Sequence, residues 1–93
     1  MYIRIIRGQA QPGQVEELAR RWRDFFLPRR EQAGVRHAYF AGDRATNTTV
    51  AVSIWDERPD AAMTAGWSDF LSEAADLSAG ETTVEEYEVL ADL

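Results

Sequence analysis

The sequence predicts an α+β fold in which a four-stranded antiparallel sheet carries two helices on one face. Three observations predict it. Apolar residues alternate in four segments, they recur every three to four residues in two others, and these segments follow the order β-α-β-β-α-β. A chain of 93 residues, 45% hydrophobic and 28% charged, has the length and composition of one globular domain, residues 1–93.

The first third of the chain predicts a strand followed by a helix. Residues Tyr2–Ala10 alternate as a strand does, and a turn follows at 11–13. The next apolar residues form one stripe of a helix: Val15, Leu18, Ala19, Trp22, Phe25 and Phe26. Pro28 cannot continue this helix without losing a hydrogen bond, so we expect a kink or restart there and an end at Gly34.

The middle of the chain predicts a β-hairpin. The second strand is expected at Val35–Ala41, and the turn at 42–47 leads to a third strand at Thr48–Trp55 that is rich in β-branched residues. On the second strand one face is expected to carry Val35, His37, Tyr39 and Ala41, and the other Arg36, Ala38 and Phe40.

The last third predicts the second helix and the fourth strand. Asp56 can cap the helix, and Pro59 suits its first turn, where a missing N–H costs little. The helix is expected over Asp60–Leu77, with an interruption at Gly66 that serves as a bend or as a mobile lid. A loop then leads to the last strand, Thr82–Leu90, with Val84 and Leu90 on one face.

This order of elements is that of the ferredoxin-like plait, in which two strand–helix–strand halves are joined by a hairpin. The last strand lies beside the first in that topology. We therefore expect Glu85, Glu86 and Glu88 to come near Arg4 and Arg7.

The charges exclude some partners. With ten Arg, no Lys and sixteen acidic residues, the net charge of −6 argues against nucleic acid and anionic membranes. Residues 1–44 hold nine Arg and five acids, whereas residues 45–93 hold one Arg and eleven acids. Either the halves interleave and neutralise each other, or a basic pocket attracts an anionic ligand. No bilayer-spanning run and no signal peptide are visible, so a cytoplasmic location is expected.

Both faces of the predicted sheet are apolar, although the helices can cover only one of them. On the first strand Tyr2 and Ile6 oppose Ile3 and Ile5, and the other strands show the same pattern. A second copy of the sheet is the simplest cover for the open face. We therefore expect a homodimer in which two sheets form an eight-stranded dimeric α/β barrel.

The chain resembles the antibiotic biosynthesis monooxygenase family of dimeric α/β barrels. The residues that carry the resemblance are Tyr2–Arg7 with Pro12-Gly13 before the helix, and Val50–Glu57 with Trp55 at the end of the third strand. The resemblance implies a homodimer with a pocket between sheet and helices in each subunit. Some members oxygenate polycyclic aromatic substrates without metal or flavin, and others degrade haem.

Haem degradation is not expected here. The haem-degrading members use an Asn on the first strand, a Trp near the end of the third strand and a His on the second helix. Trp55 matches the Trp, but the first strand has no Asn and the second helix has no His. The chain has no Cys and a single His, His37, so one chain cannot build a thiolate or multi-His metal site.

The candidate site residues are mostly aromatic. His37 is the only side chain that ordinarily titrates near neutral pH, so it is either a general base or a structural His at a sheet edge or dimer interface. Trp55 and Trp67 either line a pocket or only pack. The candidate catalytic residues are His37, as the possible general base, and Trp55 and Asn47, which are of residue types that the cofactor-free members of the family use. The candidate substrate-binding residues are Trp22, Phe26, Tyr39, Trp67 and Phe70.

The resemblance implies a cofactor-independent monooxygenase that acts on a small aromatic or polycyclic substrate, polyketide- or quinol-like, in an apolar pocket. No cofactor and no metal are expected. A proton must leave a phenol or anthrone for such chemistry, and an Arg or Asn would stabilise the oxyanion that results. The alternative is a non-catalytic dimeric protein of the same fold that binds a small hydrophobic ligand.

Overall fold

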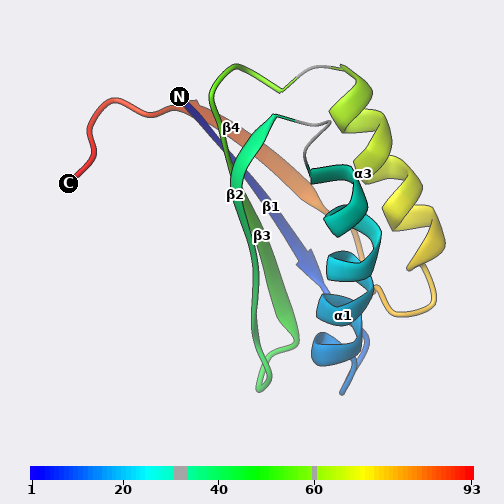
Figure 1. The fold of residues 1–93 in the computed structure, drawn as a ribbon. Coiled ribbons are helices and arrows are strands. Elements are labelled where there is room, and N and C mark those ends of the chain that lie inside the picture. The colour runs from blue at the N-terminus through cyan, green and yellow to red at the C-terminus, as the bar shows by residue number, and fades with distance from the viewer. Residues whose placement is uncertain (31–33, 60) are drawn as a thin grey trace.

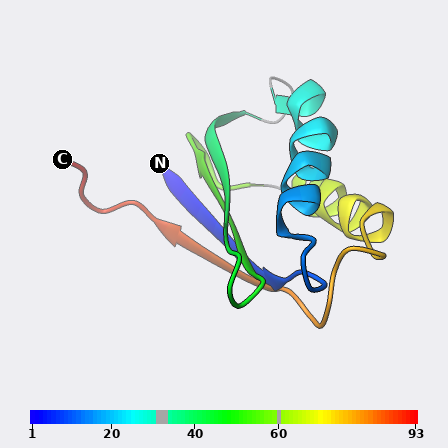
Figure 2. The same cartoon turned by 90° about the horizontal axis from the view of Figure 1, so that it is seen from below.

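The computed structural model describes residues 1–30, 34–59 and 61–93, with the backbone alone for 61–65. Within these residues four strands form one antiparallel sheet in the order β2-β3-β1-β4. The strands are β1 (Tyr2–Gln9), β2 (Val35–Asp43), β3 (Thr48–Trp55) and β4 (Thr83–Glu88), and the helices are α1 (Val15–Phe26) and α3 (Ala61–Glu73). Both helices lie on the same side of the sheet (Figures 1 and 2). The predicted ferredoxin-like α+β plait is confirmed.

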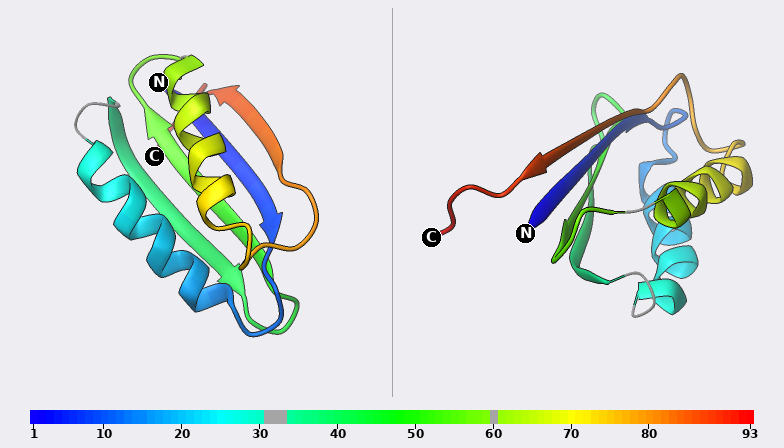
Figure 3. Two further views of the ribbon diagram at one scale, coloured as in Figure 1. Left: turned by 90° about the vertical axis from the view of Figure 1, so that its right-hand side faces the viewer. Right: turned by 90° about the horizontal axis from the view of Figure 1, so that it is seen from above.

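Strand β1 lies between β3 and β4, and its alternation defines the two faces of the sheet. Ile6 pairs with Ala51 of β3 and with Val84 of β4, and it is buried beneath the helices. We call this helix-covered side the inner face. Ile5 pairs with Val52 on the opposite side, which we call the open face; Figure 3 shows no helix on that side.

The expected contacts between the first and last strands are confirmed for Glu85 and Glu86, whereas Glu88 pairs with Tyr2. An Nη atom of Arg4 lies 2.6 Å from the Glu86 carboxylate on the inner face. The Nε atom of Arg7 lies 2.9 Å from the Glu85 carboxylate on the open face. Part of the uneven charge distribution along the chain is therefore neutralised across the β1–β4 pair.

Strands β2 and β4 depart from the predicted pattern. A β-bulge between Val35 and His37 places Val35 opposite Trp55, an inner-face residue, whereas His37 pairs with Ile54 of the open face. The expectation that Val35 shares a face with His37 is therefore wrong. Strand β4 ends at Glu88, so Leu90 does not share a strand face with Val84, and it is 88% exposed in a tail that leaves the sheet (Figure 1).

Helix α3 passes through Gly66 without a break, which corrects the predicted interruption. Among the described residues nothing lies within 4 Å of the position of a Cβ on Gly66, so no contact forces a bend. A glycine costs a helix only about 1 kcal/mol relative to alanine, which packing can offset. The helix starts at Ala61, so Asp56 is not its cap and Pro59 precedes it, while Asp60 lies outside the described residues. It ends at Glu73 rather than Leu77.

Helix α1 ends at Phe26, as the position of Pro28 predicts. A short 3-10 helix, η1 (Leu27–Arg29), takes up the proline in its first turn. Gly34 adopts a φ of +73°, a conformation that favours glycine, and strand β2 begins directly after it. The expected end at Gly34 cannot be followed through residues 31–33, which lie outside the described residues.

The core lies between the inner face and the two helices. Its buried residues come from the end of β1, the stripe of α1 and the C-terminal part of α3 with the turn after it: Ala10, Val15, Leu18, Phe70, Ala74 and Leu77. Aromatic rings of both helices and of β2 pack against this cluster. No helix among the described residues is long and apolar enough to cross a bilayer.

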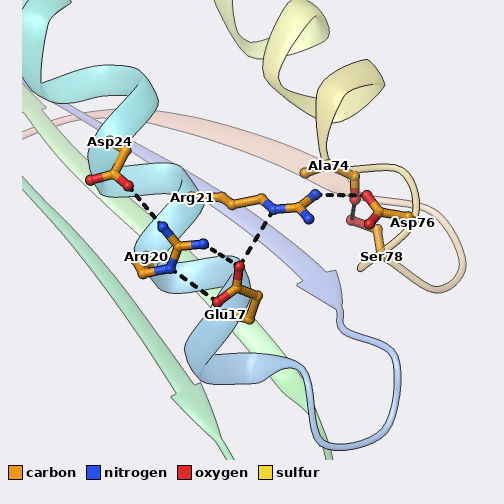
Figure 4. Close-up of polar contacts among 7 residues, drawn as sticks. All are labelled: Glu17, Arg20, Arg21, Asp24, Ala74, Asp76 and Ser78. Atoms are coloured by element: carbon orange, nitrogen blue, oxygen red, sulfur yellow. Dashed lines mark hydrogen bonds and ion pairs between the residues drawn. The ribbon is translucent and has the colours of Figure 1, made fainter.

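One ion pair among the described residues joins α1 to the turn after α3, and others lie along α1 (Figure 4). Arg21 of α1 donates from Nη1 to Asp76 in the turn after α3 at 2.8 Å, and its Nε lies 3.7 Å from Glu17 one turn earlier. Glu17 also accepts hydrogen bonds from Arg20. The Arg21 hydrogen bond lowers the pKa of Asp76 below its ordinary value of 3.8, and the Arg20 hydrogen bond lowers that of Glu17 below 4.5.

We predict that the contact of Arg21 with Asp76 stabilises the fold only above the acid range. A carboxyl whose pKa is depressed in the folded state adds stability above its unfolded pKa, and this is lost as pH falls through the lower, folded value. Asp76→Asn should therefore lower Tm at pH 7 and have no effect well below pH 3.8. The effect should be small and should shrink with salt, because the pair is exposed.

Thermal unfolding followed by circular dichroism across pH 2–7 measures this. Asp69→Asn is the matched control, since Asp69 is an exposed α3 carboxylate without an ion pair among the described residues. An Asp76→Asn difference that is the same at pH 2.5 and pH 7 would contradict the prediction.

Candidate functional site

Six aromatic rings form one cluster between the inner face and the helices: Trp22, Phe25 and Phe26 of α1, Phe40 of β2, and Trp67 and Phe70 of α3. The Phe26 and Trp67 rings stack with centroids 5.8 Å apart and planes 16° from parallel. Phe26 also contacts Phe70 at 5.5 Å, and Trp22 contacts Phe40 at 5.6 Å. The amphipathic stripe of α1 places three of these rings on one side of that helix.

The cluster unites four of the five predicted substrate-binding residues: Trp22, Phe26, Trp67 and Phe70. The fifth, Tyr39, lies on the open face, because it alternates with Phe40 along β2. Sequence reasoning missed Phe25 and Phe40 as members of the cluster. The signal was present for both, since Phe25 belongs to the α1 stripe and Phe40 faces away from His37 and Tyr39.

A small cavity lies where the cluster meets the sheet. Its volume is about 20 Å³, which is room for about one water molecule. Its walls combine rings and small residues: Ile6, Gly8, Gln9, Leu18, Phe40, Thr49, Ala51, Trp67, Phe70, Leu71, Ser78 and Thr82. The Nε1 atom of Trp67 is buried and has no hydrogen-bond partner among the described residues. A polar group introduced beside Trp67 would gain a hydrogen bond that the protein itself leaves unmade.

Trp55 lies at the end of β3 on the inner face and is only 5% exposed. Its indole Nε1 donates to Ser53 Oγ at 2.8 Å, so the next inward residue of the same strand orients the ring. No ring contact joins Trp55 to the aromatic cluster within the part of the chain that the structure describes. On the covered face of the sheet, the Ala38–Ser53 pair lies between Trp55 and the cluster residue Phe40.

His37 and Tyr39 lie on the other side of the sheet. Their rings stack at 6.3 Å with planes 16° apart, and both residues are exposed on the open face. The sheet therefore separates this predicted general base from the aromatic cluster and from Trp55. The alternation of β2 contains this signal, because His37 and Phe40 are an odd number of residues apart.

Asn47 belongs to the turn between β2 and β3, at the opposite end of β3 from Trp55. It has a φ of 60°, a left-handed conformation that Asn tolerates better than most residues. Its Oδ1 accepts from the backbone N–H of Gly13 at 3.2 Å, and its carbonyl accepts from Ala10 N–H at 2.8 Å. These bonds join the hairpin turn to the turn before α1.

Arg4 was expected only as a neighbour of the β4 acids, and the structure buries it on the inner face. It is a charged residue on the inner face, 5% exposed, and its Nε and Nη2 atoms donate to Oε1 of Glu86 at 3.1 and 2.6 Å. Ser53 is its partner on β3. Strand alternation signals the inward position, because Arg4 lies two residues before Ile6. The alternation of the strand does not predict how deeply Arg4 is buried, because Arg7 makes the same kind of ion pair in solvent.

The open face carries a second polar network at its β4 edge. Arg7 and Tyr87 both donate to the carboxylate of Glu85, at 2.9 and 2.8 Å. The Arg7 hydrogen bond, aided by that of Tyr87, lowers the pKa of Glu85 below 4.5, and donation to Glu85 raises the pKa of Tyr87 above 10.0. No group of three or more His, Cys, Asp or Glu side chains in the described part of the chain is placed to hold a metal ion.

Solved structures match this architecture along nearly the whole chain. A candidate antibiotic biosynthesis monooxygenase from Nitrosomonas europaea matches with a TM-score of 0.76 at 19% identity, over 98% of this chain and 100% of its own. The fold is that of the antibiotic biosynthesis monooxygenase family. The resemblance in the sequence is thereby confirmed at the level of the fold.

Two further matches have similar coverage. A candidate monooxygenase of the same description from Deinococcus radiodurans has 15% identity and a TM-score of 0.76, over 100% of this chain and 96% of its own. A protein from Pseudomonas aeruginosa has 24% identity and a TM-score of 0.68, over 97% and 94%. No family model and no curated protein matches the chain. At these sequence identities, the similarity shows that the fold is shared. It does not show which reaction this protein catalyses.

We predict that Asn47 acts through the turn. Asn47→Gly keeps the left-handed conformation available, so it should change the free energy of unfolding by less than ~1 kcal/mol. Asn47→Ala should cost about 1–2 kcal/mol, because alanine resists that conformation and cannot accept from Gly13. Urea unfolding of the two variants measures the difference.

The same pair of variants separates a structural role from a catalytic one. In any assay of the intact protein, Asn47→Gly should behave as the unmodified chain does, once both are folded. A loss of activity in both variants, with equal stability, would instead place Asn47 in the chemistry.

Proposed function

We propose that the protein is a cofactor-independent monooxygenase of a small aromatic or polycyclic substrate. The observation that carries this proposal is the aromatic cluster on the inner face, with Trp55 beyond it and a polar group, Trp67 Nε1, left without a partner. Stacked and tilted rings at 5–6 Å make surfaces that suit flat substrates. The shared fold with structures named antibiotic biosynthesis monooxygenase supports the same reaction class.

The reaction needs no oxidant besides dioxygen. An anthrone or hydroquinone loses a proton to give an electron-rich anion, and this anion donates electrons to O₂. For an anthrone, one oxygen atom becomes the new carbonyl while the other leaves as water with the two hydrogens of the methylene group. The protein's part is to bind the ring, stabilise the anion and exclude bulk water.

A second function, binding without catalysis, is favoured by the position of His37. The cavity of about 20 Å³ does not distinguish the two functions, because it is far smaller than a one- to three-ring aromatic and helix α3 must move away from the sheet to admit one in either case. His37, the candidate base, is on the far side of the sheet from the cluster. A dimeric binding protein would need the same apolar inner face and no base.

We further propose that two copies associate through their open faces. The central strands β1 and β3 present a branched apolar surface there: Ile3, Ile5, Val50, Val52 and Ile54. All five are only partly covered in a single chain. A sheet face of this kind is typical of an interface between copies, and a two-fold axis would set each apolar centre on the other.

Light scattering on a size-exclusion column tests this association. The chain should have twice its mass of 10.5 kDa at micromolar concentration. Val52→Arg places a charge at the centre of the open face and should reduce the mass to that of a monomer, because burying an unpaired charge costs several kcal/mol. Ser68→Arg, on the exposed side of α3, is the matched control and should leave the mass unchanged. A 10.5 kDa species for the unmodified chain would rule out the dimer.

Oxygen consumption with a panel of anthrones and hydroquinones tests the reaction. The rate should be unaffected by a chelator. Trp55→Phe should lower kcat/KM by roughly tenfold to a hundredfold, because it removes the indole that is anchored on Ser53 and so misplaces the ring beside the substrate. His37→Ala should change the rate by less than about threefold, because His37 faces the other side of the sheet.

The variants also decide where the chemistry takes place. General-base loss typically costs ~10²–10⁴-fold, so an effect of that size in His37→Ala would move the reaction to the open face. If no member of the panel gives consumption above background, the protein is not an oxygenase of this substrate class and the binding function is favoured.

A further inference from the structure

Thr49 of β3 lies between two glycines on the inner face. It pairs with Gly8 of β1 and with Gly42 of β2, and it is only 5% exposed. A Cβ on Gly8 would lie 3.1 Å from Thr49 Oγ1, whereas a Cβ on Gly42 would lie 3.9 Å from Thr49 Cγ2. The hydroxyl group is therefore turned toward β1 and the methyl group toward β2. Because glycine has no side chain, the space beside this hydroxyl group is left open.

This space is the cavity that lies where the aromatic cluster meets the sheet. Thr49 and Trp67 both line it, and its volume of about 20 Å³ is the size of one oxygen atom with its hydrogens. Within the described residues the Thr49 hydroxyl group makes no hydrogen bond, and neither does the buried Trp67 Nε1. The side chains of Gln9 and Ser78, which also line the cavity, already donate to backbone carbonyl groups. Two donors that lack a partner therefore line one small space.

The two donors suit a neutral hydrogen-bond acceptor. Trp67 Nε1 can only donate, the Thr49 hydroxyl group can donate or accept, and a carbonyl oxygen has two lone pairs that can accept from both. A buried water usually makes about three hydrogen bonds, which is more than these two groups offer. No charged residue is among the described residues that line the cavity, so an anion would be poorly stabilised there.

The walls of the cavity also connect it to the aromatic cluster. Three rings of the cluster line it: Phe40, Trp67 and Phe70. An aromatic ligand that enters the cluster therefore brings a substituent of its ring next to the two donors. The ring itself needs the movement of α3 described above, whereas one oxygen atom fits the existing space.

We propose that Trp67 Nε1 and the Thr49 hydroxyl group bind the carbonyl oxygen of an aromatic ketone or quinone, and that they thereby select ligands with this group. The proposal rests on the aromatic ligand class of the proposed function. It gives the carbonyl oxygen two neutral donors, where the sequence suggested an Arg or Asn.

NMR titration with 1-indanone and indane tests the proposal. The two probes share their ring system, and only 1-indanone has a carbonyl group. The unmodified chain should bind 1-indanone about tenfold more tightly, because two hydrogen bonds of ordinary net strength favour it. The indole N–H signal of Trp67 should lie further downfield with 1-indanone than with indane. The indole of Trp55 already donates to Ser53, so its signal should show no such difference.

Two conservative changes remove one donor each. Thr49→Val replaces the hydroxyl group with a methyl group, and Trp67→Phe keeps an aromatic ring and deletes the N–H. Each should reduce the preference for 1-indanone over indane to about threefold or less. The ratio of the two affinities is the readout, because a merely structural role would change both affinities together. Thr49→Val decides the matter if Trp67→Phe fails to fold, as judged by circular dichroism.

A third change blocks the space and keeps both donors. Gly8→Ala places a methyl group 3.1 Å from Thr49 Oγ1, at the wall of the cavity, and should remove the preference. Thr48→Val is the matched control, because Thr48 is the preceding residue of β3 and is exposed. It should keep the tenfold preference.

Equal affinity of the unmodified chain for both probes, binding of neither, or a preference that survives Thr49→Val overturns the proposal. The oxygen-consumption assay separates this result from the proposed function. A chain that prefers 1-indanone but consumes no oxygen keeps this site and loses the oxygenase function. A chain that consumes oxygen without this preference keeps the oxygenase function and loses the site.

Discussion

The register of strand β1 is the constraint on which the rest of this structure depends. It is hydrogen-bonded on both sides, to β3 and β4, and its side chains alternate between the covered and the open face. A shift of one residue would exchange the faces, exposing Ile6 and turning Arg7 inward. Contacts on the inner face fix the register: Ile6 between Ala51 and Val84, and Gly8 where a Cβ would come within 3.1 Å of Thr49 and Thr82 side chains.

The residues of the inner face differ from one end of the sheet to the other. At the end near the β2–β3 turn the backbone and helices approach closely: a Cβ on Gly42 would come within 2.6 Å of the Val15 side chain. The aromatic cluster fills the middle. Between the cluster and Trp55, the inner face carries the pair Ala38 and Ser53, and Ala38 is exposed. The close approach of Val15 to Gly42 therefore fixes how near α1 lies to the sheet at the end near the β2–β3 turn.

The order of the elements and the two apolar faces of the sheet could be predicted from the sequence, because they follow from hydrophobic periodicity. The pairing of acidic β4 with basic β1 could be predicted because it follows from the topology. The sequence was insufficient for which face the helices cover, since both faces of β2 carry rings: His37 and Tyr39 on one, Phe40 on the other. Two features depend on contacts between elements, so a local sequence pattern does not predict them. They are the bulge before His37 and the continuity of helix α3 at Gly66. Trp22, Phe26, Trp67 and Phe70 were found together because two helical stripes must meet over one sheet.

Two ion pairs with the same chemistry lie on opposite faces of the sheet. Arg4 with Glu86 and Arg7 with Glu85 join the same two strands, three residues apart on β1 and one apart on β4. An odd spacing places them on opposite faces. Arg7 stays half in water, where screening reduces its interaction energy and where its charge can lie at the rim of an apolar interface. Arg4 is in a region of low dielectric, where the same charge interacts several-fold more strongly with any anion beside it. Strand alternation thus places one ion pair at the solvent-exposed edge of the open face and the other in the buried inner face.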